Sequence, residues 1–206
     1  MRKSLQIISI VLLLAAQANG QEKGKFGLKI GYNSSMLSAS VNSDASAKGG
    51  IALGAYYDIK TKSFLHFQPE INYSSQGENE NYMAAPNGPS IGTTTVTLNY
   101  LNIPFILKFD MGKVVNFQIG PQLGILLSGR EKGTINNQPV DTDLKGVFKN
   151  DFSMVLGLGF NVTRNINFGG RLNYGLNNIY STPQGSPVDY PSVSNRVFNF
   201  FVGYTL

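Results

Sequence analysis

Six ionisable side chains are the residues of this chain whose chemistry most needs an explanation. They are Lys29, Asp58, His66, Glu70, Lys108 and Arg171. His66 is the only histidine, and catalysis by a nucleophile would need it beside a serine or an aspartate. With one histidine, no cysteine and scattered acidic residues, the chain offers no clear set of metal ligands. The sequence therefore predicts no catalytic residue, no cofactor and no metal.

All six residues lie in segments where apolar and polar side chains alternate. In residues 100–109, YLNIPFILKF, apolar side chains occupy every second position and Lys108 falls between them. Successive side chains of a β-strand point to opposite faces, so such a segment has one apolar and one polar face. The alternation predicts eight strands, at about residues 25–36, 51–58, 64–75, 93–109, 114–128, 151–162, 166–176 and 196–206. The six ionisable residues fall on the polar faces.

The connections between these segments are alternately long and short. An even number of strands long enough to cross a bilayer, with short turns on one side, is typical of outer-membrane barrels. We therefore predict an all-β fold, an eight-stranded antiparallel up-and-down transmembrane β-barrel with its apolar face toward lipid. A soluble eight-stranded barrel, apolar inside, has the same periodicity and is the alternative. Small and amide residues on the polar face, and aromatic residues near strand ends, favour the membrane barrel.

Two irregularities are predicted within the strands. Proline removes a ladder hydrogen bond, so we expect a β-bulge at Pro69. In the segment 93–109 the apolar residues occupy even positions up to Tyr100 and odd positions from Leu101. One extra residue in this strand, near Tyr100, would produce that change of face.

The first 20 residues have the features of a secretory signal peptide. Arg2 and Lys3 precede an apolar run over residues 5–16, and residues 18–20, Ala-Asn-Gly, fit a cleavage site. We expect Sec-type export with cleavage near Gly20, and a barrel domain over residues 21–206. Without Arg2 and Lys3 the formal net charge falls from +5 to +3, which is too small and too dispersed to indicate a nucleic-acid partner.

In a barrel with a polar interior, the six ionisable residues would share the lumen. Isolated buried charge is unfavourable, so we expect them to pair in a structural network that fills the barrel. The interior of eight strands is just filled by side chains, which argues against a pore. The long connections carry Tyr82, Tyr180 and Tyr190. These are candidate contacts to other proteins, although packing within the loops explains them equally well.

Four motifs of this chain resemble those of a known family. They are GLKIGYNSS from Gly27, FQPEINYS from Phe67, YLNIPFILKF from Tyr100 and GPQLGILLSG from Gly120. In this order, and over essentially the whole mature chain, they resemble the PorT-like outer-membrane β-barrel family of Bacteroidetes-type bacteria. The resemblance implies an eight-stranded barrel in the outer membrane, and one type of member serves a protein-secretion system. Asn102 departs from the glutamate common in the family, and Leu206 from the usual terminal aromatic residue.

Together these observations predict a non-enzymatic protein of the cell outer membrane. Its expected role is that of a structural or protein-interaction component of the envelope, and the resemblance adds a link to protein secretion. A small pore or transporter for small solutes is the alternative. The expected partners are outer-membrane lipid and other envelope or secretion proteins, and the sequence leaves the oligomeric state open.

Overall fold

The computed structural model describes residues 24–38, 44–85, 88–181 and 192–206. The predicted signal peptide, residues 1–20, lies outside these described residues. Among them, no helix has the length and hydropathy of a membrane span. The described strands are β1 (Lys25–Ser38), β2 (Asp44–Lys62), β3 (Leu65–Met83), β4 (Ser90–Met111), β5 (Val115–Ile135), β6 (Gln138–Asp143), β7 (Asp151–Asn161), β8 (Ile166–Gly175) and β9 (Ser194–Thr205).

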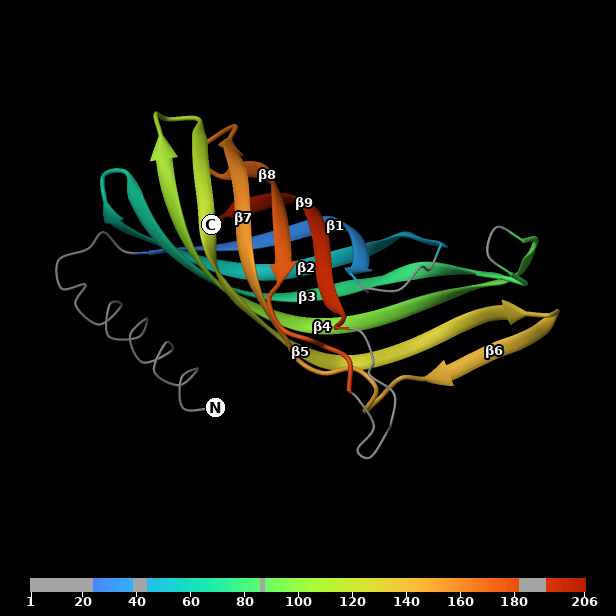
Figure 1. The fold of residues 1–206 in the computed structure, drawn as a ribbon. Coiled ribbons are helices and arrows are strands. Elements are labelled where there is room, and N and C mark those ends of the chain that lie inside the picture. Colours follow the sequence, from blue (N-terminus) through green and yellow to red (C-terminus); the bar gives the residue numbers. More distant parts are fainter. Residues whose placement is uncertain (1–23, 39–43, 86–87, 182–191) are drawn as a thin grey trace.

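Eight of these strands close into an antiparallel barrel. The ring runs β1-β2-β3-β4-β5-β7-β8-β9, and β9 pairs back with β1 (Figure 1). β6 stands outside the ring and pairs with the far part of β5. The predicted all-β, up-and-down barrel is confirmed, with eight strands in the ring and a ninth beside it.

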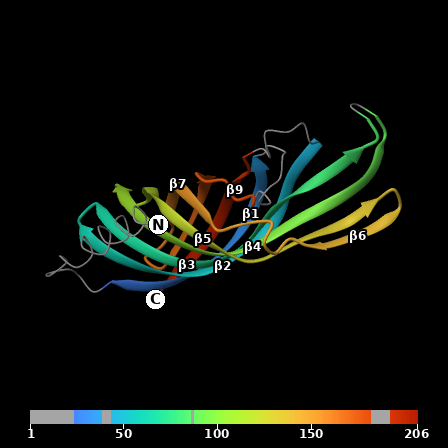
Figure 2. The same ribbon diagram turned by 60° about the horizontal axis from the view of Figure 1, so that its bottom comes forward.

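The barrel has one compact end and one extended end. The tight turns at residues 63–64, 112–114 and 162–165 lie at the compact end, which we name the turn end (left in Figure 1). At the other end, β2 to β5 continue beyond the remaining strands and form a sheet with β6 (Figure 2). We name this sheet the extended wall, and it comprises residues 44–49, 75–83, 90–99, 128–135 and 138–143.

The extended wall corrects three predicted loops. The sequence predicts loops at residues 37–48, 76–92 and 129–150, yet much of each is paired strand. In these segments both faces of the sheet are largely polar, as at residues 78–81, Glu-Asn-Glu-Asn, so the alternation that marks a half-buried strand is missing. The strands still form, because each one satisfies the backbone N–H and C=O groups of its neighbour.

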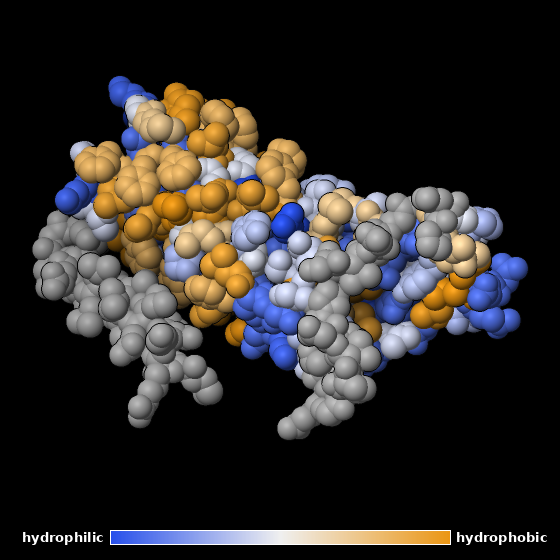
Figure 3. Space-filling view, viewed as in Figure 1, coloured by the Kyte–Doolittle hydropathy of each residue, from blue (hydrophilic) through white to orange (hydrophobic). Residues whose placement is uncertain are grey.

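Outward side chains form an apolar belt around the barrel. Ile30 on β1, Ile71 on β3 and Leu172 on β8 are 62%, 50% and 43% exposed. Figure 3 shows the belt over the barrel and a mostly polar surface over the extended wall. Inward positions such as Asn33 and Gln118 are polar and buried. The barrel therefore has the polarity of a membrane barrel, and not the apolar interior of a lipocalin-type barrel.

The irregularity between β4 and β5 differs from the predicted one. Asn99 pairs with Ser128 and Tyr100 with Leu126, so the extra residue is Leu127 on β5. Along β4, the even-numbered residues face inward without interruption from residue 94 to residue 106. The predicted bulge in β4 is therefore wrong. The apolar residues at 96, 98 and 100 point into the barrel, where they meet other apolar side chains.

Pro69 does not cause the predicted bulge either. β3 keeps one register with β4 on both sides of Pro69, from the pair Phe67 and Leu107 to the pair Asn72 and Asn102. Its register with β2 is likewise unshifted between residues 67 and 70. The missing N–H of proline costs the ladder one hydrogen bond without requiring an extra residue.

We predict that the apolar belt tolerates charge at its edge but not at its middle. Leu172→Arg on β8 should lower the free energy of unfolding from lipid vesicles by about 2–4 kcal/mol. Leu176→Arg, one residue beyond the same strand, should lower it by about 0–1 kcal/mol. Urea titration of the two variants in phosphatidylcholine vesicles measures the difference. Equal, near-zero effects would mean that this face does not meet lipid.

Candidate functional site

The centre of the barrel holds a buried charge cluster, which we name the central triad: Lys29 on β1, Glu70 on β3 and Arg171 on β8. Their side chains are 6%, 0% and 4% exposed. β3 and β8 lie four strands apart in either direction around the ring. The ion pair between Glu70 and Arg171 therefore joins opposite sides of the barrel and crosses the lumen.

The carboxylate of Glu70 accepts hydrogen bonds from four residues. Arg171 donates from Nη1 to Oε2 at 2.9 Å and from Nη2 to Oε1 at 2.8 Å, which is a bidentate pairing. Lys29 and Asn72 also donate to Oε2, the latter at 3.0 Å. Gln68 donates to Oε1 at 2.7 Å. A carboxylate withdrawn from water is tolerated when its lone pairs are satisfied in this way.

The two cations of the triad have further partners. Arg171 Nε donates to Gln118 Oε1 at 2.7 Å. The ring of Phe201 lies 4.7 Å from the guanidinium carbon of Arg171 and 5.2 Å from Lys29 Nζ. This cation–π geometry offsets part of the positive charge that one carboxylate leaves unbalanced. Gly157 faces Arg171 across the β7–β8 ladder, and a Cβ there would lie 2.7 Å from Arg171 Cγ. Glycine therefore leaves room for the long side chain.

Little empty space remains beside the triad. The cavity next to Lys29 and Arg171 measures about 20 Å³, which is room for about one water molecule. Its lining includes Asn72, Asn102 and Asn173, whose buried Oδ1 atoms have no protein donor. A bridging water would satisfy them. In the described part of the barrel, the lumen is thus filled at the level of the triad.

The other three predicted residues form a second group nearer the turn end, together with Asp110. Lys108 donates to Asp58 Oδ2, and His66 Nδ1 lies 2.5 Å from Asp58 Oδ1. His66 Nε2 lies 3.1 Å from Asp110 Oδ2. These residues belong to the adjacent strands β2, β3 and β4, so this turn-end cluster covers one side of the barrel and does not cross it. The structure thus places the six predicted residues in two charge clusters, which Gln68 links: its Oε1 accepts from Lys108 at 3.3 Å and its Nε2 donates to Glu70 at 2.7 Å.

Apolar side chains close the barrel at its extended end. We name this cluster the apolar lid, and its buried members are Leu37, Val96, Leu98, Tyr100, Leu144, Ile179 and Val193. The Tyr100 hydroxyl donates to Lys149 O at 3.2 Å, and Lys149 N donates to Ile179 O at 2.7 Å. These bonds hold two loop segments over the mouth of the barrel. Apolar constrictions exclude water and ions. The lid therefore closes the lumen at the extended end, in addition to the triad that fills its centre.

The three tyrosines predicted as loop contacts have different surroundings. Tyr180 packs edge-on against Phe148 beside the apolar lid, with ring centres 5.8 Å apart and planes at 89°. This contact is packing between loop segments. Tyr82 lies on β3 within the extended wall, and its hydroxyl donates to Glu80 Oε2 at 2.8 Å. Tyr190 lies outside the described residues.

Glu78 is a buried glutamate of the extended wall, beyond the apolar belt on the side away from the turn end. Its side chain lies beside the backbone of β1, where Leu37 N donates to Glu78 Oε2 at 3.2 Å. Burial, and in smaller part the charge of Glu80, raises the pKa of Glu78 from 4.5 to about 7, although the hydrogen bond from Leu37 favours the charged form. The folded wall therefore keeps a proton on Glu78 at pH values where the unfolded chain has lost it.

Sequence reasoning missed Asp110, Gln118 and the apolar lid. Asp110 continues the even-numbered, inward series of β4 after Lys108, but it stands in a segment predicted as a turn. Gln118 lies on the polar face of β5, yet strand periodicity cannot pair it with Arg171 two strands away. The change of apolar face at Tyr100 was the sequence signal of the lid.

The apolar belt and the filled polar lumen define a small membrane β-barrel. A model of the family described as "Outer membrane protein beta-barrel domain" matches residues 15–181. The chain belongs to this family, whose place is the outer membrane. A comparison with curated protein sequences finds no match.

Two solved structures align with most of this chain. Neisserial surface protein A is 16% identical, with a TM-score of 0.50, and the alignment covers 91% of this chain and 100% of that one. Ail, the attachment invasion locus protein of Yersinia pestis, solved in complex with the heparin analogue sucrose octasulfate, is 15% identical. Its TM-score is 0.49, with 90% of this chain and 100% of that one covered. The likeness to the neisserial protein shows a shared fold.

We predict that Glu70→Ala lowers the free energy of unfolding by about 3–5 kcal/mol, because it leaves two buried cations without their anion. Arg130→Ala removes an exposed pair with Asp141 and serves as the control, which should stay within error of the wild type. Urea titration followed by circular dichroism and by gel shift measures both. A Glu70→Ala barrel as stable as the control would contradict the role given to the triad.

We also predict that stability falls as the pH rises from about 4.5 to about 7. In this window the unfolded chain releases the Glu78 proton while the folded chain keeps it, so deprotonation favours unfolding. Glu78→Gln keeps the shape without the charge and should be less sensitive to pH. Melting temperatures across the window test this. Asp143→Asn, at an exposed position, should retain the wild-type pH dependence, and an identical profile for Glu78→Gln would refute the assignment.

Proposed function

We propose that this protein is a non-enzymatic, closed outer-membrane barrel that displays the extended wall outside the cell for contact with other envelope proteins. Short turns of outer-membrane barrels face the periplasm, and their long connections face outward. The turn end is then periplasmic, and the wall projects from the cell surface. The observation that carries the proposal is the wall itself, a sheet that continues the barrel strands beyond the apolar belt.

The construction of the wall supports a role in recognition. The β3–β4 ladder runs without a shift from the barrel to the pair Tyr82 and Gly92, and the β4–β5 ladder ends at Ile135. Recognition surfaces are effective when a rigid scaffold positions them. β6 forms an edge of the wall, and an edge strand offers unpaired backbone groups to another chain. The wall thus supplies both a polar face and a strand edge for a protein partner.

A small pore is the alternative function, and it needs a continuous aqueous path. The Glu70–Arg171 pair crosses that path, and the apolar lid covers it at the extended end. We therefore favour the interaction role. The absence of catalysis is part of the same proposal. His66 does have aspartate neighbours, Asp58 and Asp110, but both contacts are carboxylates, and no contact recorded for His66 among the described residues supplies a hydroxyl or thiol nucleophile.

We further propose that the protein is exported by a cleaved signal peptide and is related to the PorT-like proteins. The basic residues Arg2 and Lys3 and the apolar run after them support a signal peptide at residues 1–20, cleaved near Gly20 after Sec-type export. Residues 21–206 are then the barrel domain. The PorT-like motifs support a link to protein secretion, for which the wall would be the contact surface.

Removal of the wall hairpin tests the proposal. In the variant, residues 79–95 are replaced by Asn-Gly, a turn that suits a two-residue hairpin between Glu78 and Val96. We predict that the wild-type protein, extracted mildly and crosslinked, migrates with envelope proteins, and that the shortened variant migrates alone. Heat-dependent gel mobility controls for a folded barrel. The proposal fails if the two proteins have the same native partners or if the wild type also migrates alone.

A further inference from the structure

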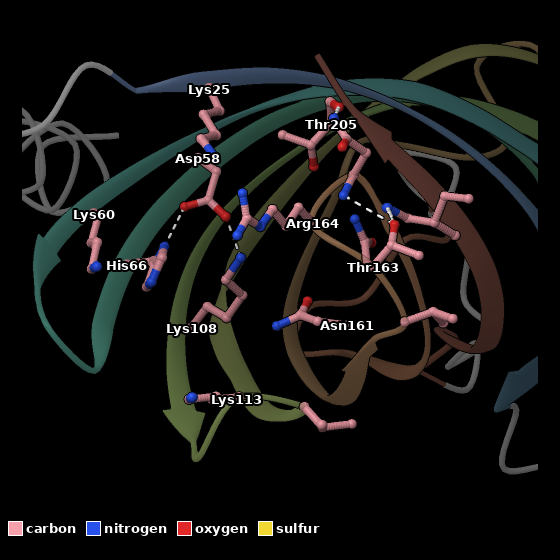
Figure 4. Close-up of a pocket in the computed structure, with 15 residues that line it drawn as sticks. Lys25, Asp58, Lys60, His66, Lys108, Lys113, Asn161, Thr163, Arg164 and Thr205 are labelled. Carbon is pink, nitrogen blue, oxygen red and sulfur yellow. Dashed lines mark hydrogen bonds and ion pairs between the residues drawn. The ribbon is translucent and has the colours of Figure 1, made fainter.

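A cavity of about 490 Å³ opens at the turn end of the barrel (Figure 4). Its basic lining residues come from several parts of the ring: Lys25 on β1, Lys60 on β2, Lys108 on β4, Lys113 in the β4–β5 turn and Arg164 in the β7–β8 turn. Because the central triad fills the barrel further in, the cavity is a blind cup. Its volume lies within the range of small-molecule sites, roughly 300–1,000 Å³.

The charge of this lining is strongly unbalanced. The five lysine and arginine side chains, with His66, face a single lining carboxylate, that of Asp58. Figure 4 shows Asp58 bound to His66 and Lys108. The other nearby carboxylate, Asp110, faces His66. Both acids of the turn-end cluster are therefore already engaged.

Among the described residues, three cations around the mouth have no carboxylate partner. The ion pairs of the described residues do not include Lys25, Lys113 or Arg164. These residues come from separate parts of the ring, so they surround the mouth instead of lining one side of it. A cleft lined by charge of one sign focuses its field on a counter-ion. The arrangement therefore favours an anion inside the cup.

The neutral residues of the lining indicate the kind of anion. Amide and hydroxyl side chains predominate, namely Asn161, Thr163, Asn165, Asn167 and Thr205, and the apolar members are Val114, Val162 and Ile166. The polar side chains outnumber the apolar ones, so the lining offers a ligand many hydrogen-bonding groups. Lysine and arginine bind phosphate and carboxylate groups well, and several cations around one space favour a ligand with several such groups.

We propose that the turn-end cavity binds a small soluble polyanion that carries two or more phosphate or carboxylate groups and enters from the periplasm. A phospholipid headgroup has similar chemistry, but lipid meets the outer belt, whereas these cations line the inside of the barrel mouth. The site does not depend on the extended wall or on the interaction role; only its access from the periplasm rests on the orientation proposed above.

Calorimetry on the full barrel in zwitterionic nanodiscs tests the site, with inorganic pyrophosphate and tricarballylate as probes and acetate as the monovalent comparison. Lys113→Gln/Arg164→Gln removes two exposed cations of the cavity. Lys132→Gln/Lys145→Gln removes the same charge from exposed positions near the extended end. We expect saturable binding of at least one polyvalent probe. The cavity variant should weaken it about tenfold or more, as expected when charge-assisted hydrogen bonds are lost, and the control should retain wild-type affinity.

Two outcomes would overturn the proposal. One is the absence of saturable binding, or equal binding by wild type and the cavity variant, in zwitterionic nanodiscs. The other comes from nanodiscs that contain phosphatidylglycerol. If the cavity variant loses enrichment of that lipid around the barrel while neither soluble probe binds the wild type, the cations serve a headgroup and the site for a soluble ligand is wrong.

Discussion

The ion pair between Glu70 and Arg171 is the contact on which the interior of this barrel depends. It joins β3 to β8 across the lumen, and both side chains are removed from water. Charges in such a place must be paired and hydrogen-bonded, so the surrounding residues have little freedom. Further bonds come from Lys29, Gln68, Asn72 and Gln118. The lack of a side chain at residue 157 gives the arginine its space. The same constraint that stabilises the interior also fills it.

The two ends of the barrel differ because their surroundings differ. Within the apolar belt, lipid on one side and a packed lumen on the other favour apolar outward side chains and mainly polar inward ones, with apolar exceptions inside such as Ile106 and Phe201. Beyond the belt, β2 to β5 meet water on much of both faces, and the extended wall is maintained by its backbone ladder together with side-chain bonds such as that from Thr95 to Asn79. The apolar lid separates these regions. At the opposite end, the turns bring Lys113 and Arg164, which form no ion pair with another described residue, to the rim of an open cup. One closed barrel thus presents two chemically distinct surfaces to two compartments.

The sequence was informative wherever one face of a strand is apolar. Alternation in residues 100–109 and in the seven other segments predicted the ring, because lipid contact leaves a period-two pattern. The alternation also placed Lys29, Glu70 and Arg171 on inward faces. Because periodicity shows which face a residue occupies but not which residue it contacts, the ion pair across the lumen could not be predicted. Most of the extended wall was missed because most of its strand segments lack an apolar face; residues 93–99, which carry Val96 and Leu98, were predicted as strand. The change from even to odd apolar positions at Tyr100 was recognised in the sequence but wrongly interpreted as a bulge in β4. The strand continues unbroken, and the even-numbered apolar side chains up to Tyr100 point inward into the lid instead of outward to lipid.

Planar-bilayer conductance of the purified wild-type barrel tests the closed lumen most directly. A filled interior predicts no discrete channels at either polarity, although the protein is inserted and folded as shown by gel mobility. Reproducible single-channel steps from the wild-type barrel would contradict the account. They would mean that the Glu70–Arg171 pair and the apolar lid open in the membrane, and the pore function would then replace the interaction role.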